Sequence, residues 1–309
     1  MDPIAGIKYA KDSTLAMLLA AQAHGFELHY LEQQDLFLRD GIAMGHSRPL
    51  SVRADAGGWF TLGEPSTGPL GAFNVILMRK DPPFDMEFIH TSYILGRAEE
   101  QGALVVNRPQ GLRDMNEKVY TAWFPECCAP TLITRSMADM EAFAREHGKI
   151  VCKPLDGMGG RSIFVTDLAD KNRGVIFETL TAQGARFAMV QRYLPEIVES
   201  GDSRVLLVAG EPVPYALARI PAAGDNRGNL AAGAQGVGRA LNERDRWLAA
   251  KIGPTLAARG MLFVGLDVIG GFVTEINVTS PTGIRELDKQ FHINIGDLLM
   301  QAIEHRLHP

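Results

Sequence analysis

A glycine-rich segment supplies the first chemical signal in the sequence. Lys153–Ser162 reads KPLDGMGGRS and lies between two strand-like runs. Gly157, Gly159 and Gly160 leave backbone N–H groups that can turn toward an anion without interference from side chains. Lys153 ends the first strand, where it can meet a phosphate or an adenine nitrogen. The glycine spacing matches neither a P-loop nor a Rossmann fingerprint. A tight β-turn beside a surface lysine fits the segment equally.

Two further segments carry polar groups suited to a nucleotide. The run 191–195 ends a strand and could expose backbone groups to an adenine edge, although a plain strand end fits as well. Asp202 and Arg204 lie two residues apart on the next strand and therefore share a face. A carboxylate suits ribose hydroxyls, and a guanidinium binds phosphate oxygens in pairs. The alternative is a surface ion pair.

A hairpin near the C-terminus offers ligands for a hard cation. Its strands flank Gly270-Gly271, and Glu275 and Asn277 share one face of the second strand. With Asp267 nearby they supply the oxygen ligands that Mg²⁺ takes together with substrate phosphates. Asp267 and Glu275 oppose each other only across a three-residue turn or a β-bulge, so we expect one of these. An exposed polar face of an edge hairpin is the competing interpretation.

Residues 221–238, PAAGDNRGNLAAGAQGVG, contain almost no large apolar side chain. A loop of this length inside a compact domain is uncommon unless it is a lid or a linker. The strands on both sides belong to the same unit, which favours a mobile lid. Arg219 and Arg227 would give such a lid positive charge with which to close over phosphate.

The composition is that of an ordinary globular chain. Its 309 residues suggest about two domains, and 46% hydrophobic residues exclude a disordered chain. The net charge of −5 includes no basic stripe, so nucleic acid is not an expected partner. Three cysteines without a CxxC pair argue against a zinc site or a disulfide framework and favour a reducing cytosol. We see no signal-peptide pattern and no apolar run near the ~20 residues of a membrane span.

Strands alternate with helices in the N-terminal part, which predicts a parallel, doubly wound α/β domain with a hairpin or long excursion at residues 40–71. After a junction at residues 109–116, the second half reads as α+β with antiparallel hairpins. The expected helices are residues 13–25, 87–102, 116–124, 136–147 and 293–307. The expected strands are residues 27–31, 75–78, 104–106, 149–153, 162–165, 189–192, 205–208, 214–220, 262–269 and 272–278.

Five strings together resemble the bacterial glutathione synthetases, a family of the ATP-grasp superfamily, over essentially the whole chain. RKDPPFD and RGNLAAG are the strings that point to this family rather than to the superfamily. The five lie at residues 78–85 (MRKDPPFD), 107–118 (NRPQGLRDMNEK), 153–160 (KPLDGMGG), 219–233 (RIPAAGDNRGNLAAG) and 274–285 (TEINVTSPTGIR).

The resemblance implies a ligase that joins γ-glutamylcysteine to glycine with ATP, giving glutathione, ADP and phosphate. A carboxylate is a poor electrophile, and phosphorylation to an acyl phosphate creates a leaving group that the glycine amine can displace. Phosphoryl transfer depends on positioning and charge neutralisation, so none of the eight histidines is needed as a nucleophile. The resemblance also implies Mg²⁺ or Mn²⁺, a cytoplasmic location and a homotetramer.

The resemblance further implies a substrate-binding domain at residues 1–115 and an ATP-grasp domain at residues 116–309, with lobes at about 120–193 and 194–309. Carried over by position, the site residues are Lys118 and Lys153 for ATP, Gly157, Met158, Gly159 and Gly160 over the phosphates, Gln191, Tyr193 and Leu194 at adenine, Asp202 at ribose, Arg204 and Arg219 at the transferring phosphoryl group, Asp267, Glu275 and Asn277 for the metal, and Arg79, Lys80, Arg227, Ser280 and Thr282 for the peptide. The stretch before Arg204 is one residue longer than the family pattern, so Glu199 is an alternative ribose ligand.

Two other functions share the nucleotide-binding strings. One is another ATP-grasp carboxylate–amine ligase, and RKDPPFD and RGNLAAG argue against it. The other is a non-catalytic ATP-binding regulator, which the retained arginines and metal pair argue against.

The N-terminus raises a separate expectation. In the resembled family a short strand leads into the MDPI segment, and here Met1 is the first residue of that segment. We therefore expect a gap between residues 27–31 and 75–78, and a start codon a few residues upstream. A sheet repacked without the strand is the alternative.

Overall fold

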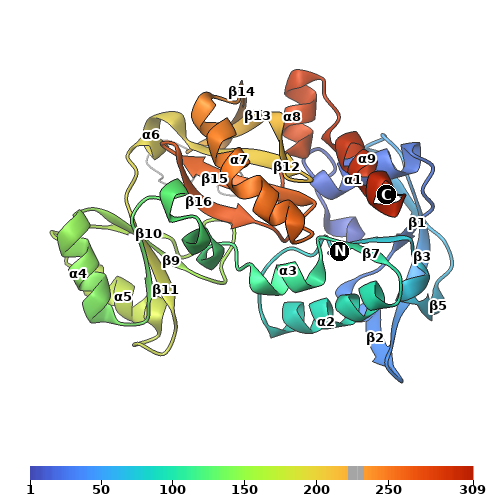
Figure 1. The fold of residues 1–309 in the computed structure, drawn as a ribbon, viewed down its shortest axis with the longest axis horizontal. Helices are drawn as coiled ribbons and strands as arrows, with labels where there is room; N and C mark the ends of the chain where they lie inside the picture. The colour runs from blue at the N-terminus through green and yellow to red at the C-terminus, as the bar shows by residue number, and fades with distance from the viewer. Residues whose placement is uncertain (222–227, 229–232, 309) are drawn as a thin grey trace.

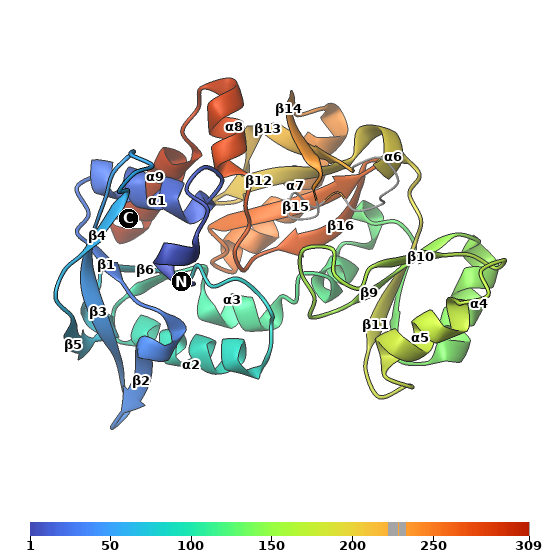
Figure 2. The same cartoon turned by 180° about the vertical axis from the view of Figure 1, so that it is seen from behind.

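The computed structural model describes residues 1–221, 228 and 233–308. Its sheets and helices form three parts arranged along the length of the molecule. The N-terminal region lies at one end, a small lobe lies at the other, and a larger lobe lies between them (Figures 1 and 2). The predicted mixed α/β class with a two-lobed C-terminal part is confirmed. Among the described residues no helix is long and apolar enough to cross a membrane.

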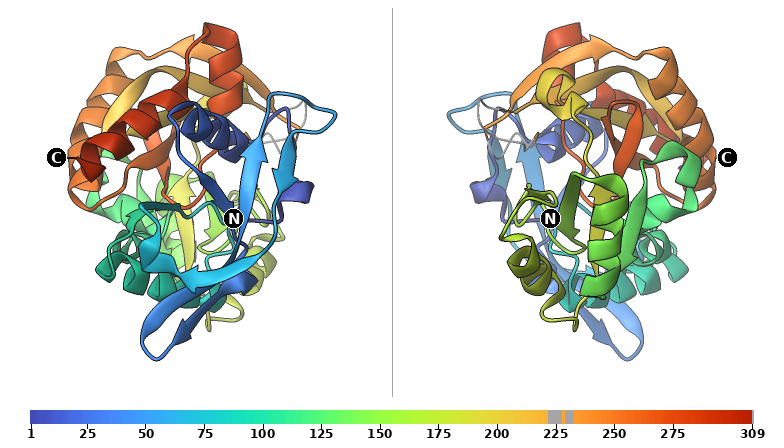
Figure 3. Two further views of the ribbon diagram at one scale, coloured as in Figure 1. Left: turned by 90° about the vertical axis from the view of Figure 1, so that its right-hand side faces the viewer. Right: turned by 90° about the vertical axis from the view of Figure 1, so that its left-hand side faces the viewer.

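The N-terminal region is built around one long strand, β3, which faces the viewer in the left panel of Figure 3. Four shorter strands pair antiparallel with it, so the predicted excursion at residues 40–71 consists of hairpins. The strands are β1 Leu28–Tyr30, β2 Leu36–Arg39, β3 Ile42–Val52, β4 Phe60–Leu62 and β5 Ser66–Pro69. Helices α1 Ser13–Ala23 and α2 Met86–Glu100 begin as expected, because Asp12 and Asp85 accept hydrogen bonds from backbone N–H groups in the first turn.

Fewer strands pair in parallel in this region than the sequence predicts. Only β6 Val75–Leu77 and β7 Leu104–Val106 pair in parallel among the described strands, and β1 pairs antiparallel with β3 instead. The strands β1 and β6 both line a cavity of about 650 Å³, so the expected gap between them is present. The Met1 amine donates to the carbonyl oxygen of Leu31 (2.9 Å) at this cavity, and burial lowers the pKa of that amine.

The small lobe is a four-stranded antiparallel sheet packed against two helices. Its strand order is β10–β9–β11–β8, and a cluster that includes Met140, Ile150 and Phe177 fills the space between sheet and helices. The elements are β8 Thr131–Thr134, α4 Met137–His147, β9 Ile150–Pro154, β10 Phe164–Thr166, α5 Arg173–Thr181 and β11 Ala188–Arg192. The glycine-rich loop connects β9 to β10, as predicted.

The large lobe is a five-stranded antiparallel sheet with the order β14–β13–β12–β15–β16. Its elements are α6 Glu196–Ser200, β12 Asp202–Val208, β13 Glu211–Ile220, β14 Gln235–Ala240, α7 Glu243–Ala258, β15 Phe263–Ile269, β16 Phe272–Asn277, α8 Ile284–Phe291 and α9 Ile295–Leu307. The predicted lid at 221–238 is too long at its C-terminal end, because β14 begins at Gln235 and pairs with β13. Residues 222–227 and 229–232 of that segment, Arg227 included, lie outside the described residues.

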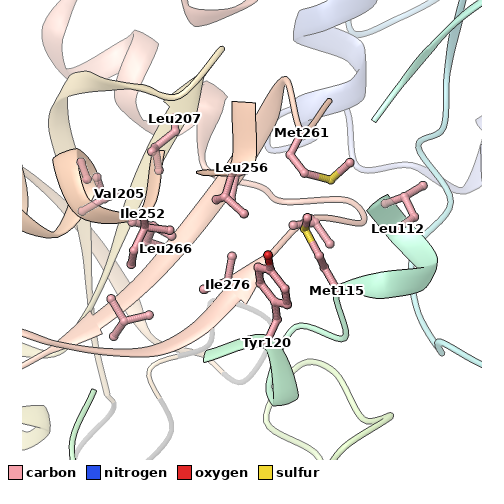
Figure 4. Packing of buried hydrophobic residues seen from close by; sticks show 14 of the residues in the cluster. Leu112, Met115, Tyr120, Val205, Leu207, Ile252, Leu256, Met261, Leu266 and Ile276 are labelled. Atoms are coloured by element: carbon pink, nitrogen blue, oxygen red, sulfur yellow. The ribbon is translucent and has the colours of Figure 1, made fainter. Parts of the chain in front are cut away.

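Apolar clusters join the N-terminal region to the large lobe, and the larger of the two includes helix α3 Pro109–Asp114. This helix and the 3₁₀ helix Val119–Trp123 contribute Leu112, Met115 and Tyr120, which lie beside Leu256 and Ile276 of the lobe (Figure 4). The predicted helix at 116–124 is therefore only a short 3₁₀ turn, and the predicted junction at 109–116 is mostly helix.

Helix α7 was not predicted from the sequence, because Pro254 lies inside it. A proline removes one backbone hydrogen bond and clashes with the preceding turn, so sequence patterns read it as a helix end. Here Leu248, Ile252 and Leu256 are all fully buried against the sheet. Burial of each such side chain contributes ~1.5–3 kcal/mol, enough to offset the proline.

The cavity between β1 and β6 generates a stability prediction. Fusing a short apolar segment (Val-Ile-Val-Val) ahead of Met1 should raise the melting temperature. Burial of each apolar side chain stabilises the fold by ~1.5–3 kcal/mol, and the sum of these gains exceeds the entropic cost of ordering the added backbone. Calorimetry of the fusion, with an equally long Gly-Ser fusion as control, measures the effect. At this chain length each kcal/mol shifts the melting temperature by roughly 2–4 °C or less. Equal melting temperatures for the two fusions would contradict the prediction.

Candidate active site

Two acidic and two arginine side chains meet on the face of the large-lobe sheet. Arg204 on β12 lies opposite Asp267 on β15, with Nε 2.6 Å from Oδ1 and Nη2 3.0 Å from Oδ2. Arg219 on β13 lies opposite Asp202 on β12, and its Nη2 is 2.6 Å from Asp202 Oδ2 and 2.9 Å from Asp267 Oδ2. Strand register alone brings these pairs together, because directly opposed residues share a face.

The two carboxylates of this cluster differ in their electrostatics. Burial would raise the pKa of Asp267, but the guanidinium groups of Arg204 and Arg219 hold it well below its usual range. Burial raises the pKa of Asp202 to about 6, opposed by Arg219 and reinforced by the negative charge of Asp267. Asp267 is therefore the fixed anion of the cluster, and Asp202 titrates closer to neutral pH.

Asp202 also carries an acceptor atom without a partner. Its Oδ1 is buried and receives no hydrogen bond from the described residues, while the side chain lines the cavity between the two lobes. A buried acceptor of this kind fits a ligand hydroxyl group. Glu199, the alternative raised by the sequence, is exposed on α6 and does not line this cavity.

Gly228 approaches the cluster closely. A Cβ atom at this position would lie 2.6 Å from Asp202 Cβ and 3.0 Å from the Arg219 carbonyl oxygen, so only glycine fits. Gly228 also lines the cavity. One residue of the 221–238 segment is thus placed directly over the acid–arginine cluster.

Two lysines converge on Glu275, which is paired with Asp267 on the neighbouring strand of the same sheet. Lys118 Nζ is 3.6 Å and Lys153 Nζ 3.8 Å from Glu275 Oε1, and both lysines are buried. Lys118 also donates to the carbonyl oxygen of Gly157 (2.8 Å), which ties it to the glycine-rich loop. Burial lowers the pKa of Lys153, although Glu275 opposes the shift. Two ammonium groups against one carboxylate leave positive charge suited to phosphate.

The glycine-rich loop and the end of β11 complete the cavity wall. The lining includes seven residues that are proposed from the sequence to bind the nucleotide: Gly157, Met158, Gly159, Gly160, Gln191, Tyr193 and Leu194. Gln191 Nε2 donates to Thr131 Oγ1 (3.0 Å), and the Tyr193 N–H donates to the Lys149 carbonyl oxygen (3.0 Å). The backbone N–H of Tyr193 is therefore used within the protein.

The hairpin geometry is the one that the metal interpretation requires. Ile269 pairs with Phe272 across a two-residue turn, and the register then shifts so that Asp267 directly opposes Glu275. The shift leaves Thr274 unpaired. This is the β-bulge that the eight-residue separation of Asp267 and Glu275 requires across a two-residue turn. This prediction is confirmed.

The donor set fits a divalent cation in part. Glu275 and Asn277 offer hard oxygen atoms on one face, and Asn277 uses its amide nitrogen rather than its oxygen in the bond to Gly265 O (3.3 Å). Both oxygens of Asp267 are bound by arginines; within the described part of the chain, Oδ1 accepts only from Arg204 and keeps a lone pair that a metal could use. Among the described residues no three His, Cys, Asp or Glu side chains are grouped for a metal, so the carboxylates would need further ligands, such as the Asn277 amide oxygen or substrate phosphates.

The predicted peptide-binding residues form a separate group beside the arginines. Arg79 is buried and donates to Thr14 Oγ1 and to the Pro281 carbonyl oxygen (3.1 Å each), and burial lowers its pKa to about 10. Arg204 Nη1 donates to the Thr282 carbonyl oxygen (3.3 Å), so residues 281–282 bridge the two groups.

Lys80 lies at the margin of this group. Its ammonium nitrogen is 2.7 Å from Asp2 Oδ1, and it lines the cavity beside β1 rather than the one between the lobes. Ser280 bonds to the side chain of Asp81, a residue that sequence analysis did not single out although it follows Arg79-Lys80 in the quoted string. Thr131 was missed because nothing local links it to Gln191, 60 residues away.

Comparisons with known proteins agree with this arrangement. Residues 1–113 match the profile "Prokaryotic glutathione synthetase, N-terminal domain", and residues 117–292 match "Prokaryotic glutathione synthetase, ATP-grasp domain". Glutathione synthetase of Pseudomonas aeruginosa PAO1 is 59% identical over 99% of this chain and 96% of its own length. The enzyme of that name from Escherichia coli K12 is 56% identical over 99% and 97%.

Solved structures support the fold alone, because their sequence identity to this chain is low. The ATP-grasp ligase PsnB complexed with minimal precursor has a TM-score of 0.62 at 19% identity and covers 95% of each chain. The RimK domain protein ATP-grasp from Sphaerobacter thermophilus has a TM-score of 0.61 at 16% identity and covers 94% of each.

The raised pKa of Asp202 predicts a pH-dependent stability difference. Between its ordinary value of 3.8 and about 6, the folded chain holds a proton that the unfolded chain has released. The free energy of unfolding of the parent chain, relative to Asp202→Asn, should therefore fall as the pH rises from about 4.5 to 7. Urea unfolding of both proteins at the two pH values measures this difference. A difference that is independent of pH, or that grows with pH, would show the assignment to be incorrect.

Proposed function

The chain belongs to the prokaryotic glutathione synthetase family, and we propose that the cavity between its two lobes is the site of the family's reaction. The chain is an ATP-dependent carbon–nitrogen ligase that makes glutathione from γ-glutamylcysteine and glycine. The observation that carries the assignment of the site is the meeting of Asp202 and Asp267, which bind the buried Arg204 and Arg219, with the Lys118–Lys153–Glu275 group around one cavity.

The nucleotide-binding part of the proposal follows from the cavity lining. Lys118 and Lys153 bind phosphate oxygens, and the backbone N–H groups of residues 157–160 cover them. Gln191, Tyr193 and Leu194 contact the adenine ring, and Asp202 Oδ1 accepts a ribose hydroxyl. The buried, unpartnered state of that oxygen supports Asp202 over Glu199.

Arg204 and Arg219 stabilise the phosphoryl group during its transfer to the cysteinyl carboxylate. Both guanidinium groups are already oriented by Asp202 and Asp267, so little reorganisation is needed when charge develops on the phosphoryl oxygens. Glu275 and Asn277, together with Asp267 Oδ1, would hold Mg²⁺ or Mn²⁺, which neutralises phosphate charge.

The peptide-binding part rests on the group next to Arg204. Arg79, Lys80, Ser280 and Thr282 hold γ-glutamylcysteine, with Arg227 as a further contact. The acyl phosphate then forms close to residues 281–282, where glycine attacks it. Exclusion of water from this point protects the intermediate from hydrolysis.

The proposal also covers the domain boundaries, the cellular location and the oligomeric state of the chain. We divide the chain into a substrate-binding domain at residues 1–115 and an ATP-grasp domain at residues 116–309, and the two profile matches, to residues 1–113 and 117–292, support this division. Membership of the family supports a cytoplasmic homotetramer that requires no nucleic acid or membrane partner.

The reaction itself is tested by product analysis. Incubation with ATP, Mg²⁺, γ-glutamylcysteine and glycine should release phosphate and glutathione in equal amounts, because each ligation consumes one ATP. Omission of glycine should abolish glutathione. Turnover that requires a different amine acceptor would identify another ATP-grasp ligase, and ATP binding without turnover would identify a regulator.

Glu275→Gln tests the proposed metal site. The substitution removes one ligand charge, so kcat should fall at least ~10-fold, and a higher Mg²⁺ concentration should restore part of it. Titration of activity against Mg²⁺ measures both effects. Glu178→Gln, on the exposed face of α5, is the matched control and should behave as the parent chain. A Glu275→Gln profile identical to that of Glu178→Gln would exclude Glu275 from the metal site.

A further inference from the structure

Residues 116–118 hold the small lobe, the large lobe and the nucleotide cavity together. Asn116 Nδ2 donates to the carbonyl oxygen of Leu155 (3.1 Å), and Lys118 Nζ donates to that of Gly157 (2.8 Å), so both bind the glycine-rich loop. Asn116 Oδ1 also accepts from the N–H groups of Lys118 and Val119, which fixes the turn between them. The residue between Asn116 and Lys118 makes its contacts on the other side.

That residue, Glu117, binds the large lobe through both backbone and side chain. Its carbonyl oxygen accepts from the Ile276 N–H (2.8 Å) on β16. Its Oε1 accepts from the Thr279 N–H (3.2 Å) and the Thr279 hydroxyl (2.5 Å) just beyond that strand. These bonds bracket Asn277 and adjoin Glu275, the proposed metal ligands.

The surroundings of Glu117 hold it rigidly. Its neighbours Met115 and Tyr120 are fully buried beside Ile276 (Figure 4). Burial raises the pKa of Glu117, while the Thr279 hydrogen bonds and Lys118 oppose the shift. A buried carboxylate is costly unless it is hydrogen-bonded, so the two bonds from Thr279 are what make this position tolerable.

We propose that Glu117 is a positioning residue for the nucleotide site. It fixes the position of the strand end that carries Glu275 and Asn277 relative to Lys118 and the glycine-rich loop. Glu117 itself does not line the cavity. This inference rests on the proposed function, because it assumes that the cavity between the lobes binds the nucleotide.

The test measures affinity for a non-hydrolysable ATP analogue with Mg²⁺ by calorimetry, together with the melting temperature. Glu117→Ala should weaken binding by ~10-fold or more, in the range seen when groups supporting a ligand are removed. Glu117→Gln keeps an oxygen acceptor for Thr279 and should bind within about threefold of the parent chain. Glu286→Ala, on α8 against β13 and β14, removes another partly buried carboxylate and should bind as the parent does.

A double variant of Glu117 and Thr279 distinguishes a positioning role of Glu117 from a general loss of stability. Thr279→Val removes one donor, and the Glu117→Ala, Thr279→Val double variant should bind no more weakly than Glu117→Ala alone. Should Glu117→Ala fail to fold, Thr279→Val decides: weakened binding at an unchanged melting temperature supports the proposal, and unchanged binding overturns it. Glu117→Ala that binds as tightly as Glu286→Ala, or Glu117→Gln that binds as weakly as Glu117→Ala, also overturns it. A parent chain that binds the analogue but makes no glutathione would refute the proposed function and leave this inference intact.

Discussion

The carboxylate of Asp267 is shared by two buried arginines, and the rest of the site is arranged around this contact. Arg204 and Arg219 come from different strands, β12 and β13, and Asp267 comes from a third, β15. Removing one partner of such a buried cluster leaves an uncompensated charge and costs about 3–5 kcal/mol. The cluster therefore makes one strand register far more favourable than any slipped alternative.

The same cluster holds two buried arginines next to two carboxylates that line the cavity. The charges of the arginines are balanced by Asp267 and Asp202, so the protein can keep both guanidinium groups buried before a substrate arrives. A phosphate that enters the cavity competes with these carboxylates for the same donors. The Lys118–Lys153–Glu275 group beside this cluster repeats the arrangement with ammonium groups, and residues 116–118 connect the glycine-rich loop to β16.

Much of the site was predictable because β-strand geometry is local. Alternation placed Asp202 with Arg204 and Glu275 with Asn277, and counting from the Gly270-Gly271 turn required the bulge that the structure contains. The helix caps at Asp12 and Asp85 follow from neighbouring residues in the same way. Helix α7 was not predictable, because the burial of its apolar face outweighs the local effect of Pro254.

The sequence by itself determined which side chains share a strand face, where the glycine-rich loop lies between two strands, and which strings identify the family. Only the tertiary structure decided which carboxylate pairs with which arginine, that Asp202 rather than Glu199 faces the cavity, and that Glu117 bonds to Thr279, 162 residues away. The physical reason is the range of the interactions. Backbone alternation and capping act within a few residues, whereas ion pairing and burial depend on strands that meet only after the whole chain has folded.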